Sequence, residues 1–449
     1  MQEKIISGFS KLTKAEKLTW VTRHYVADAE AAAGEIAGFT HADERLQQVL
    51  DRFSENTVAN YPMPFGIAPN FLINGRVYAV PMVIEESSVV AAASSAAKFW
   101  LARGGFKAEV LSTVKLGQVH FTWSGDPARL RLAFAELESR LRLDAAYLTE
   151  NMEKRGGGVG QIELIDLSDR EPGLFQLRIA FETCDSMGAN FINSVLEQFS
   201  ATLEEFAAAH PALQPDGKDL VVIMAILSNY TPECVVRAYV ECPVDRLAGA
   251  CKELGPAAFA EKFRKAVRIA QVDPYRAVTH NKGIFNGVDA VVLATANDFR
   301  AIEACGHAYA ARDGQYRSLS NCTVEDGLFR FWADLPLAVG TVGGLTNLHP
   351  LARRSLDILG NPSAEELMAI VACTGLAQNF AALRSLITTG IQSGHMKMHL
   401  ANILHHLGAG EQETREAIEH FRDKTVSFAA VREFLNSFSG NAGVVSKAP

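Results

Sequence analysis

The chain has 449 residues, of which 48% are hydrophobic and 21% charged, and its formal net charge is −8. A chain of this length exceeds one compact core, and its acidic balance argues against a nucleic-acid partner, because phosphate binding requires a basic surface. The seven cysteines include no Cys-x-x-Cys pair, which is typical of reduced thiols in a cytoplasm. No segment has the pattern of a signal peptide, and no continuous apolar run has the length of a membrane span. The sequence therefore predicts a soluble, cytoplasmic protein of two or three domains that binds neither nucleic acid nor membrane.

The N-terminal quarter changes from a helical to a strand pattern. Residues 11–54 carry leucine, valine and alanine at three- and four-residue spacing, which predicts helices. Asn74-Gly75 lies between two apolar stretches and indicates a tight β-hairpin, because both turn positions favour positive φ. The hairpin leads through Glu86 into an alanine- and serine-rich helix that begins near residue 89. Carboxylates at a helix start are commonly capping groups, so Glu86 is a candidate only if a second functional stretch converges on it.

Residues 106–209 predict a small α+β unit. Strands are expected over 106–124, with a turn at Lys115-Leu-Gly117, and Asp126-Pro127 begins a helix that extends to about residue 148. Two further strands and a long amphipathic helix follow, and this order is typical of a ferredoxin-like arrangement. The turn before that helix, 185–190, has the strand–turn–helix geometry in which backbone N–H groups bind phosphate. It lacks the G-x-G-x-x-G pattern, so a tight turn without a ligand is the alternative.

The stretch from His280 to Arg300 joins polar residues to an apolar block. The strand-like segments 221–227 and 235–240 before it are expected to resume the sheet of the first domain. Lys282 and Asp298 are 16 positions apart, so on one unbroken helix they would point to nearly opposite sides. If both serve one site, the helix must break between them, and Gly283 or Gly287 would supply the break. A structural ion pair beside a buried helix is the alternative.

The C-terminal third carries a glycine-rich segment and a histidine-rich one. Gly340-Thr-Val-Gly-Gly344 follows a strand and permits close approach of the backbone to a ligand, although a bare turn is possible as well. Residues 364–389 predict one or two helices. His395 and His399 share a helix face, but Met396 stands where a zinc protease requires glutamate, so no metal site is expected.

Five stretches, taken together and in this order, resemble the soluble class II 3-hydroxy-3-methylglutaryl-coenzyme A (HMG-CoA) reductases, including those called degradative. The similarity extends from about Leu12 to about Phe421, and the set is specific although no single motif would suffice. The five stretches are Pro81–Glu86, Asp185–Asn190, His280–Asp289, Gly340–Gly344 and Gly394–His395.

The resemblance implies an α+β fold with a large mixed helix/sheet substrate domain interrupted by a small one. The substrate domain comprises 1–110 and 219–390, the inserted ferredoxin-like NAD(P)-binding domain comprises 111–218, and a C-terminal helical flap comprises 391–449. It also implies a homodimer, or a multiple of dimers, whose active site takes residues from both subunits.

The implied reaction interconverts HMG-CoA with mevalonate and coenzyme A by two successive hydride transfers with NAD or NADP. Lys282 would stabilise negative charge on the carbonyl oxygen, Asp298 would tune that proton network, Glu86 would protonate the aldehyde oxygen, and His395 would protonate the departing thiolate. The remaining expected contacts are, for the substrate, Ser88, Arg276, Asn286, Gln378 and Asn379, and for the cofactor, Gln161, Asp185, Met187, Gly188, Ala189, Asn190, Gly343 and Gly344.

Two departures from the family pattern bear on specificity. The family has Glu-Asn-Val-Ile-Gly where this chain has Glu55-Asn-Thr-Val-Ala59, which affects the expected fit of coenzyme A. NAD-using relatives have an aspartate three positions after the triple glycine, where this chain has Gln161. An aspartate repels a 2′-phosphate, so activity with NADPH as well as NADH is expected.

The sequence leaves open the physiological direction and two alternative functions. One is a catalytically silent relative that binds acyl-coenzyme A or a partner, and the other is a reductase of a different acyl-coenzyme A thioester. The intact set of Glu86, Lys282, Asp298 and His395 favours the reductase.

Overall fold

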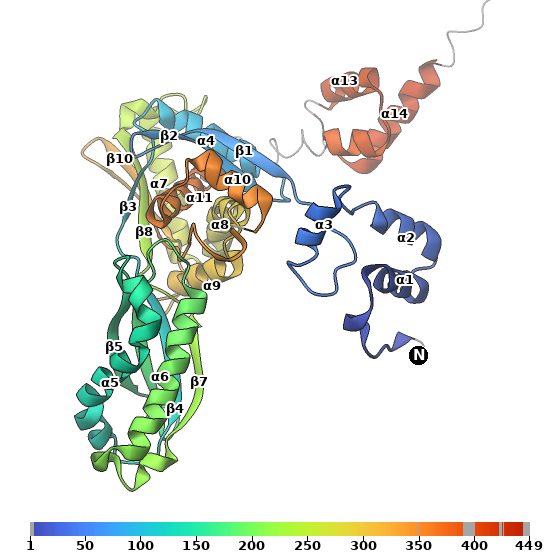
Figure 1. Ribbon diagram of the computed structural model, residues 1–449. Helices are drawn as coiled ribbons and strands as arrows, with labels where there is room; N and C mark the ends of the chain where they lie inside the picture. Colours follow the sequence, from blue (N-terminus) through green and yellow to red (C-terminus); the bar gives the residue numbers. More distant parts are fainter. Residues whose placement is uncertain (1–3, 347, 389–399, 422–423, 425, 443–449) are drawn as a thin grey trace, which may run out of the picture.

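The computed structural model describes residues 4–346, 348–388, 400–421, 424 and 426–442. Figure 1 shows an elongated body that contains the sheets, with an N-terminal group of helices and a C-terminal group of helices beside it. The chain therefore has the mixed helix and sheet content that the sequence predicts.

The upper part of the body contains a hairpin and a four-stranded antiparallel sheet. The hairpin turns at Asn74 and Gly75, whose φ angles are 48° and 86°, as predicted from the sequence. The sheet has the order β3-β8-β10-β9. The bounds are β1 Phe65–Ile73 and β2 Arg76–Val83 for the hairpin, and β3 Lys107–Val110, β8 Val235–Pro243, β9 Ser320–Glu325 and β10 Leu328–Pro336 for the sheet.

Two long helices cross closely inside this part. A Cβ on Gly287 of α8 (Pro274–Ala294) would lie 2.6 Å from the carbonyl oxygen of Thr374 on α11 (Ala364–Ile387). A Cβ on Gly375 would likewise lie 2.7 Å from a methyl carbon of Val288. Glycine is therefore needed here for helix packing. The predicted break at Gly283 or Gly287 is wrong, because α8 continues through both residues.

Further helices surround the crossing: α4 Val89–Leu101, α7 Pro256–Val272, α9 Phe299–Ala310 and α10 Pro350–Leu359. Among the described residues, α11 alone is long and apolar enough to cross a membrane, with a mean hydropathy of 1.4 over its best 18-residue window. The sequence pattern predicts no membrane-spanning segment. In the fold, 83% of that window is buried inside the protein, so α11 forms the centre of the core.

The lower part of the body is a second antiparallel sheet with its own core. In chain order, its elements are β4 (Lys115–Thr122), α5 (Pro127–Glu153), β5 (Gly158–Asp166), β6 (Leu174–Glu182), α6 (Ala189–Ala209) and β7 (Val221–Ser228). The sheet order is β5-β6-β4-β7, and buried aromatic residues such as Phe121 and Phe175 stack inside it. This βαββαβ order is the ferredoxin-like pattern.

Two local predictions in this region are wrong. The segment 221–227 does not resume the first sheet, because β7 pairs with β4 from Leu116↔Ser228 to Thr122↔Val221. Lys115 and Gly117 do not form a turn, because both lie in β4. Gly117 is required there for packing, since a Cβ would lie 2.7 Å from the Leu196 side chain of α6.

The second sheet is inserted between adjacent strands of the first. The chain leaves through β3 and returns through β8, which pair antiparallel. Just beyond them, the N–H of Leu111 donates to the Val235 carbonyl at 2.8 Å, and the N–H of Val235 donates to the Ser112 carbonyl at 3.0 Å. The inserted unit therefore ends near residue 234, beyond the expected boundary at 218.

The N-terminal helices have almost no core of their own. They are α1 (Lys14–Tyr25), α2 (Ala29–Ala37) and α3 (Glu44–Leu50), within the range predicted to be helical. Between residues 4 and 60, a stretch described throughout, Thr22 is the single buried residue. Polar contacts and aromatic contacts, such as Phe9 against Trp20, hold this part together.

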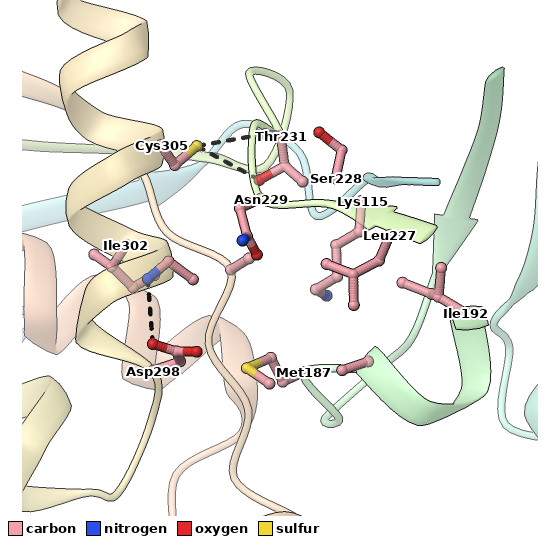
Figure 2. A pocket seen from close by; sticks show the side chains of 13 residues that line it. Lys115, Met187, Ile192, Leu227, Ser228, Asn229, Thr231, Asp298, Ile302 and Cys305 are labelled. Carbon is pink, nitrogen blue, oxygen red and sulfur yellow. Dashed lines mark hydrogen bonds between the residues drawn. The ribbon is translucent and has the colours of Figure 1, made fainter. Parts of the chain in front are cut away.

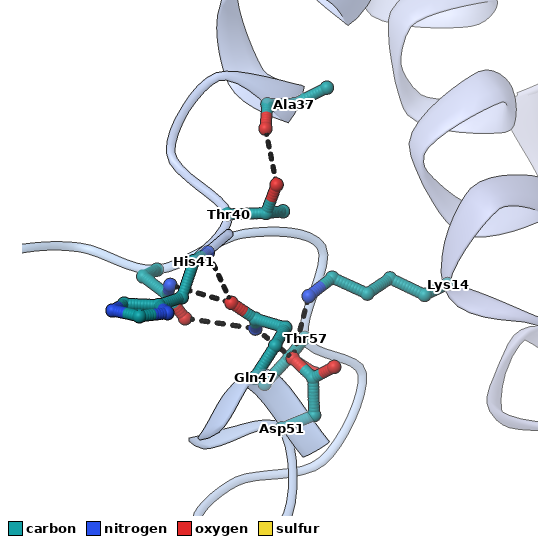
Figure 3. A network of polar contacts seen from close by, with 8 residues as sticks. Lys14, Ala37, Thr40, His41, Gln47, Asp51 and Thr57 are labelled. Atoms are coloured by element: carbon teal, nitrogen blue, oxygen red, sulfur yellow. Dashed lines mark hydrogen bonds and ion pairs between the residues drawn. The ribbon is translucent and has the colours of Figure 1, made fainter. Parts of the chain in front are cut away.

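Figure 3 shows the network that joins α1 and α3 to the segment expected to contact coenzyme A. Lys14 pairs with Asp51 at 2.6 Å, and Gln47 donates to the same carboxylate at 2.8 Å. Thr57, within Glu55–Ala59, donates to Asp51 at 3.4 Å. The position of this segment therefore depends on the N-terminal helices.

The C-terminal helices form a third, smaller unit. It comprises the helical residues 400–406, α13 (Glu411–His420) and α14 (Phe428–Ala442). Its buried residues include Leu404, Phe421 and Val431.

Candidate functional site

Glu86 and Ser88 lie in the loop that connects β2 to α4. Ser88 adopts a left-handed conformation, with φ 74°, and its side chain makes no capping hydrogen bond to α4. This conformation is uncommon for a residue with a side chain. It leaves the Ser88 hydroxyl free of a backbone partner at the start of the helix, and Ser88 lines a cavity there.

One face of α8 presents charged and polar side chains to the same cavity. Lys282 and Asn286 are four positions apart and share one face, and Arg276 lines the same cavity from the first turn of the helix. The Nζ of Lys282 lies 2.5 Å from Oε2 of Glu86, and Asn286 donates to the same oxygen at 3.4 Å. The 280–289 stretch therefore converges on Glu86, which supports Glu86 as a candidate site residue rather than a capping group alone.

The cavity has a volume of about 470 Å³ and is closed on another side by α11. Gln378 and Asn379 line it, and the Gln378 Oε1 is buried without a hydrogen-bond donor among the described residues. Burial lowers the pKa of Arg276, which forms no hydrogen bond or ion pair with any described residue. Two cations, one carboxylate and an unsatisfied amide oxygen make this cavity suited to a polar, anionic ligand.

A buried polar network supports the cavity wall from behind. The Nε2 of His280 lies 2.6 Å from the Ser320 hydroxyl, which donates to Oδ1 of Asn379 at 2.9 Å. Burial and the Arg276 charge lower the pKa of His280 to about 3. His280 is therefore neutral at physiological pH, and its network fixes the orientation of Asn379.

Asp298 lies elsewhere, at the end of α8 opposite to Arg276. The helix continues for 12 residues from Lys282 to Ala294, a rise of about 18 Å. Asp298 caps α9 by accepting from the N–H groups of Arg300 and Ala301, and its carboxylate pairs with the Arg300 side chain at 3.1 Å. Burial tends to raise its pKa, but the Arg300 and backbone hydrogen bonds keep it below the usual value. Asp298 is therefore an ionised carboxylate that does not contact Lys282 of the same chain.

A second, narrower cavity of about 110 Å³ contains Asp298. Figure 2 shows Asp298 and Met187 on one side of this space, and Lys115 and Leu227 on the other. Ala189 also lines it, so the first turn of α6 reaches the cavity. The cavity thus lies between the inserted unit and α9.

The two stretches expected to lie along the cofactor pack against each other. The Asp185 carbonyl accepts from the N–H of Thr341 at 2.8 Å, and Ser186 forms an isolated parallel bridge with Val342. A Cβ on Gly340 would lie 2.4 Å from the backbone nitrogen of Met187, so glycine is required for this contact. Gly188 has φ 85° and begins α6, and Asn190 is exposed in its first turn.

Other expected cofactor residues lie at the edges of this arrangement. Gly343 and Gly344 have positive φ angles of 84° and 55° and are exposed. Gln161 is exposed on β5, at a bulge opposite β6, and donates to Glu163 at 3.1 Å. The Asp185 side chain accepts from the Ala364 N–H at 2.7 Å and so is used at the start of α11.

His395 lies outside the described residues, as do Gly394 and His399. No group of three or more potential metal ligands occurs within the described ranges.

Sequence reasoning missed two residues at these cavities. His280 belongs to the 280–289 stretch, but the sequence does not reveal that its side chain is buried, so it predicts no role for this residue. Lys115 lies in β4 on the same face as Val119 and Phe121, both of which are buried. The alternation of a strand could have identified Lys115 as an inward-facing lysine.

Comparisons with known proteins identify the family of the chain. The hydroxymethylglutaryl-coenzyme A reductase family model matches residues 15–400. The 3-hydroxy-3-methylglutaryl-coenzyme A reductase of Archaeoglobus fulgidus is 36% identical over 96% of this chain and 94% of its own length. A probable reductase of Borreliella burgdorferi is 34% identical over 80% of this chain and 79% of its own.

Solved structures show the same similarity. The reductase of Streptococcus pneumoniae superimposes with a TM-score of 0.69 at 38% identity, covering 85% of this chain and all of that one. A class II form from the same organism, bound to NADPH in open conformations, gives a TM-score of 0.67 at 38% identity over the same shares of the two chains. The chain therefore belongs to the class II branch of the hydroxymethylglutaryl-coenzyme A reductase family, whose members are NAD(P)H-dependent oxidoreductases.

Proposed function

We propose that this protein reduces HMG-CoA to mevalonate and coenzyme A in the cavity formed by α8, α11 and the β2–α4 loop. The observation that carries the proposal is the contact between Lys282 and Glu86, which places an ammonium group and a carboxyl group side by side on one wall of the cavity. Arg276 has no protein partner within the described residues, so it is free to bind the carboxylate of the hydroxymethylglutaryl group.

The proposed chemistry follows from the charges of these groups. Two NAD(P)H molecules, bound one after the other, would each supply one hydride, the first for the thioester carbonyl carbon and the second for the aldehyde carbon. Lys282 points its ammonium at the carbonyl oxygen and stabilises the negative charge that develops there. Glu86, which shares a hydrogen bond with Lys282, transfers a proton to the aldehyde oxygen in the second reduction. His395, by resemblance, protonates the coenzyme A thiolate when the carbon–sulfur bond breaks.

We further propose that the inserted unit, residues 111–234, binds the nicotinamide cofactor, and that the flanking segments form the substrate domain. The 185–190 turn supports this role, because Met187 and Ala189 line the narrower cavity while Ser186 pairs with Val342 of the 340–344 segment. The C-terminal unit with its small core is proposed as the flap that carries His395 to the site. The seven free cysteines are consistent with action in a cytoplasm.

The active site is proposed to form between two copies of the chain. Lys282 and Asp298 are too far apart along α8 to serve one reaction within one chain. The coreless N-terminal helices support a dimer as well, because such a segment needs a surface to pack against. So does β7, which exposes Val221, Ile223, Met224 and Ile226 by half or more at an edge of the small sheet.

One experiment tests the reaction. Purified protein is mixed with NADPH or NADH and HMG-CoA, and nicotinamide absorbance is followed with mevalonate measured at the end. Two cofactors consumed per mevalonate are expected. A folded dimer that oxidises neither cofactor would favour the silent acyl-coenzyme A-binding relative, and turnover of a different thioester alone would favour the other alternative.

A second experiment tests the shared site. Lys282→Ala and Asp298→Ala chains, each inactive alone, are unfolded and refolded together. If the residues meet across the interface, random pairing leaves one intact site in half of the dimers, which is about a quarter of wild-type activity. No recovery would show that both residues act within one chain.

A further inference from the structure

Lys115 is a buried cation without a partner in the part of the chain that the structure describes. It is the first residue of β4, only 4% of its surface is exposed, and it forms no hydrogen bond or ion pair with any residue that the structure describes. Figure 2 shows its side chain extending from β4 into the narrower cavity, toward the space between Met187 and Asp298. A buried ammonium is costly unless a polar group balances it.

The neighbouring acidic groups are already engaged. The Glu182 carboxylate accepts from the Thr113 hydroxyl and from the backbone N–H of Cys184. Asp298 pairs with Arg300 and caps α9.

The nearby thiols do not supply a counter-ion either. Burial raises the pKa of Cys234 to about 11, although the Lys115 charge opposes that rise. Burial also raises the pKa of Cys305, which lines the cavity. Both thiols are therefore neutral at physiological pH, and the Lys115 charge is directed at whatever enters the cavity.

The size of the cavity identifies the part of the cofactor that it fits. At about 110 Å³ it is too small for a dinucleotide but comparable to cavities of roughly 150 Å³ that hold a benzene ring. The ring at the reacting end of the cofactor is the nicotinamide, and Asp298 in the same cavity is one of the expected catalytic groups. The following inference rests on the proposed function of this site.

The geometry points to Lys115 as a residue that makes the site bind the reduced cofactor more tightly than the oxidised one. The oxidised nicotinamide ring carries a positive charge and the reduced ring is neutral, so a fixed cation beside the ring repels only the oxidised form. At an effective dielectric constant of about 20, the repulsion amounts to about a hundredfold in affinity at about 6 Å and still to about tenfold at about 12 Å. The reaction needs two reduced cofactors in turn, so Lys115 would promote exchange of the spent cofactor between the two hydride transfers.

The test compares affinities for the two redox forms. Dissociation constants for NADPH and NADP⁺ are measured by calorimetry on the wild-type protein, on Lys115→Met, which keeps the length of the side chain, and on Lys115→Arg, which keeps the charge. The ratio of the NADP⁺ constant to the NADPH constant is expected to fall about tenfold in Lys115→Met and to stay near the wild-type value in Lys115→Arg.

The same titration with 2′-phospho-ADP-ribose, which lacks the nicotinamide, separates this role from others. Its affinity is expected to be unchanged in Lys115→Met. Equal weakening of NADPH, NADP⁺ and 2′-phospho-ADP-ribose would overturn the inference, because Lys115 would then contact the phosphates or support the fold. An unchanged ratio would overturn it as well. Failure of the wild-type protein to bind either form, with NADH and NAD⁺ also inert, would instead remove the proposed function itself.

Discussion

The two cavities of the body differ in how they hold charge. In the wider cavity Lys282 is paired with Glu86, and the side chain of Lys282 is 58% exposed, so the ion pair contributes little to stability. In the narrower cavity Lys115 is buried and has no ion-pair partner among the described residues, and Asp298 is held by Arg300 and the start of α9. The first arrangement suits groups that exchange protons with a substrate, and the second suits a fixed field around a ring.

The largest expected effect comes from removing the exposed lysine. Lys282→Ala takes away the charge that faces the carbonyl oxygen, so kcat should fall on the order of a hundredfold or more, while the melting temperature stays near that of the wild type. Lys265→Ala is a matched control, because Lys265 also lies in an exposed ion pair on a helix, 3.8 Å from Glu261. Equal activity of the two variants would show that the Glu86–Lys282 pair is only structural.

A selective effect is expected from His395→Gln. Reduction of the thioester releases coenzyme A, whose thiolate needs a proton, whereas reduction of the aldehyde releases none. The variant should therefore lose most of its activity with HMG-CoA and retain most of it with added mevaldehyde. Equal loss with both substrates would assign His395 to the shape of the site or to closure of the flap.

A smaller effect is expected at Gln161 on β5, the edge strand of the inserted sheet. Gln161→Asp places a carboxylate on β5 that would repel the 2′-phosphate of NADPH, so kcat/KM with NADPH should fall about tenfold while kcat/KM with NADH is kept. Wild-type protein should use both cofactors. A wild-type preference for NADH above about a thousandfold would show that other residues set the choice.

The effect with the smallest expected consequence for catalysis lies between α8 and α9, at residues that line neither cavity. Asp289 on α8 lies against Glu303 on α9, and burial, followed by the Glu303 charge, raises the pKa of Asp289 to about 8. A carboxyl whose pKa is raised on folding stabilises the protein fully below its unfolded value, near 3.9, and that stability is lost as pH rises toward 8.

Asp289→Asn should remove this dependence. In denaturant titrations the variant should gain stability relative to the wild type by up to about 1.4 kcal/mol for each pH unit between pH 4 and pH 8, and this advantage should vanish below about pH 4. Asp313→Asn, on an exposed turn, provides the control. A wild-type advantage that grows with pH would contradict the predicted direction.

The sequence was sufficient for the features that depend on local chemistry. The Asn74-Gly75 hairpin, the Asp126 cap and the α6 turn follow from backbone preferences, and the structure has all three. It was insufficient where the answer depends on distant partners. Gly287 looks like a helix breaker in isolation, yet it serves as the contact point of two helices.

The same distinction applies to the candidate site. Glu86 and Lys282 could be brought together only by family resemblance, because 196 positions separate them in sequence. Lys115 could have been recognised from strand alternation, but its lack of a partner required the surrounding side chains to be placed. An apolar run likewise predicts that β7 is a strand but not which sheet it joins, since either sheet could accept it.

The route by which the inserted unit leaves and rejoins the body has a consequence for how the two can be separated. Because β3 and β8 are neighbours, the first and last residues of the insert, near 111 and 234, are held together by backbone hydrogen bonds. A segment with adjacent ends can be cut out and expressed alone, or exchanged for a related segment, with only a short linker closing the gap. The insert, which contributes one wall of the narrower cavity, could therefore be exchanged between relatives while the four-stranded sheet of the body stays intact.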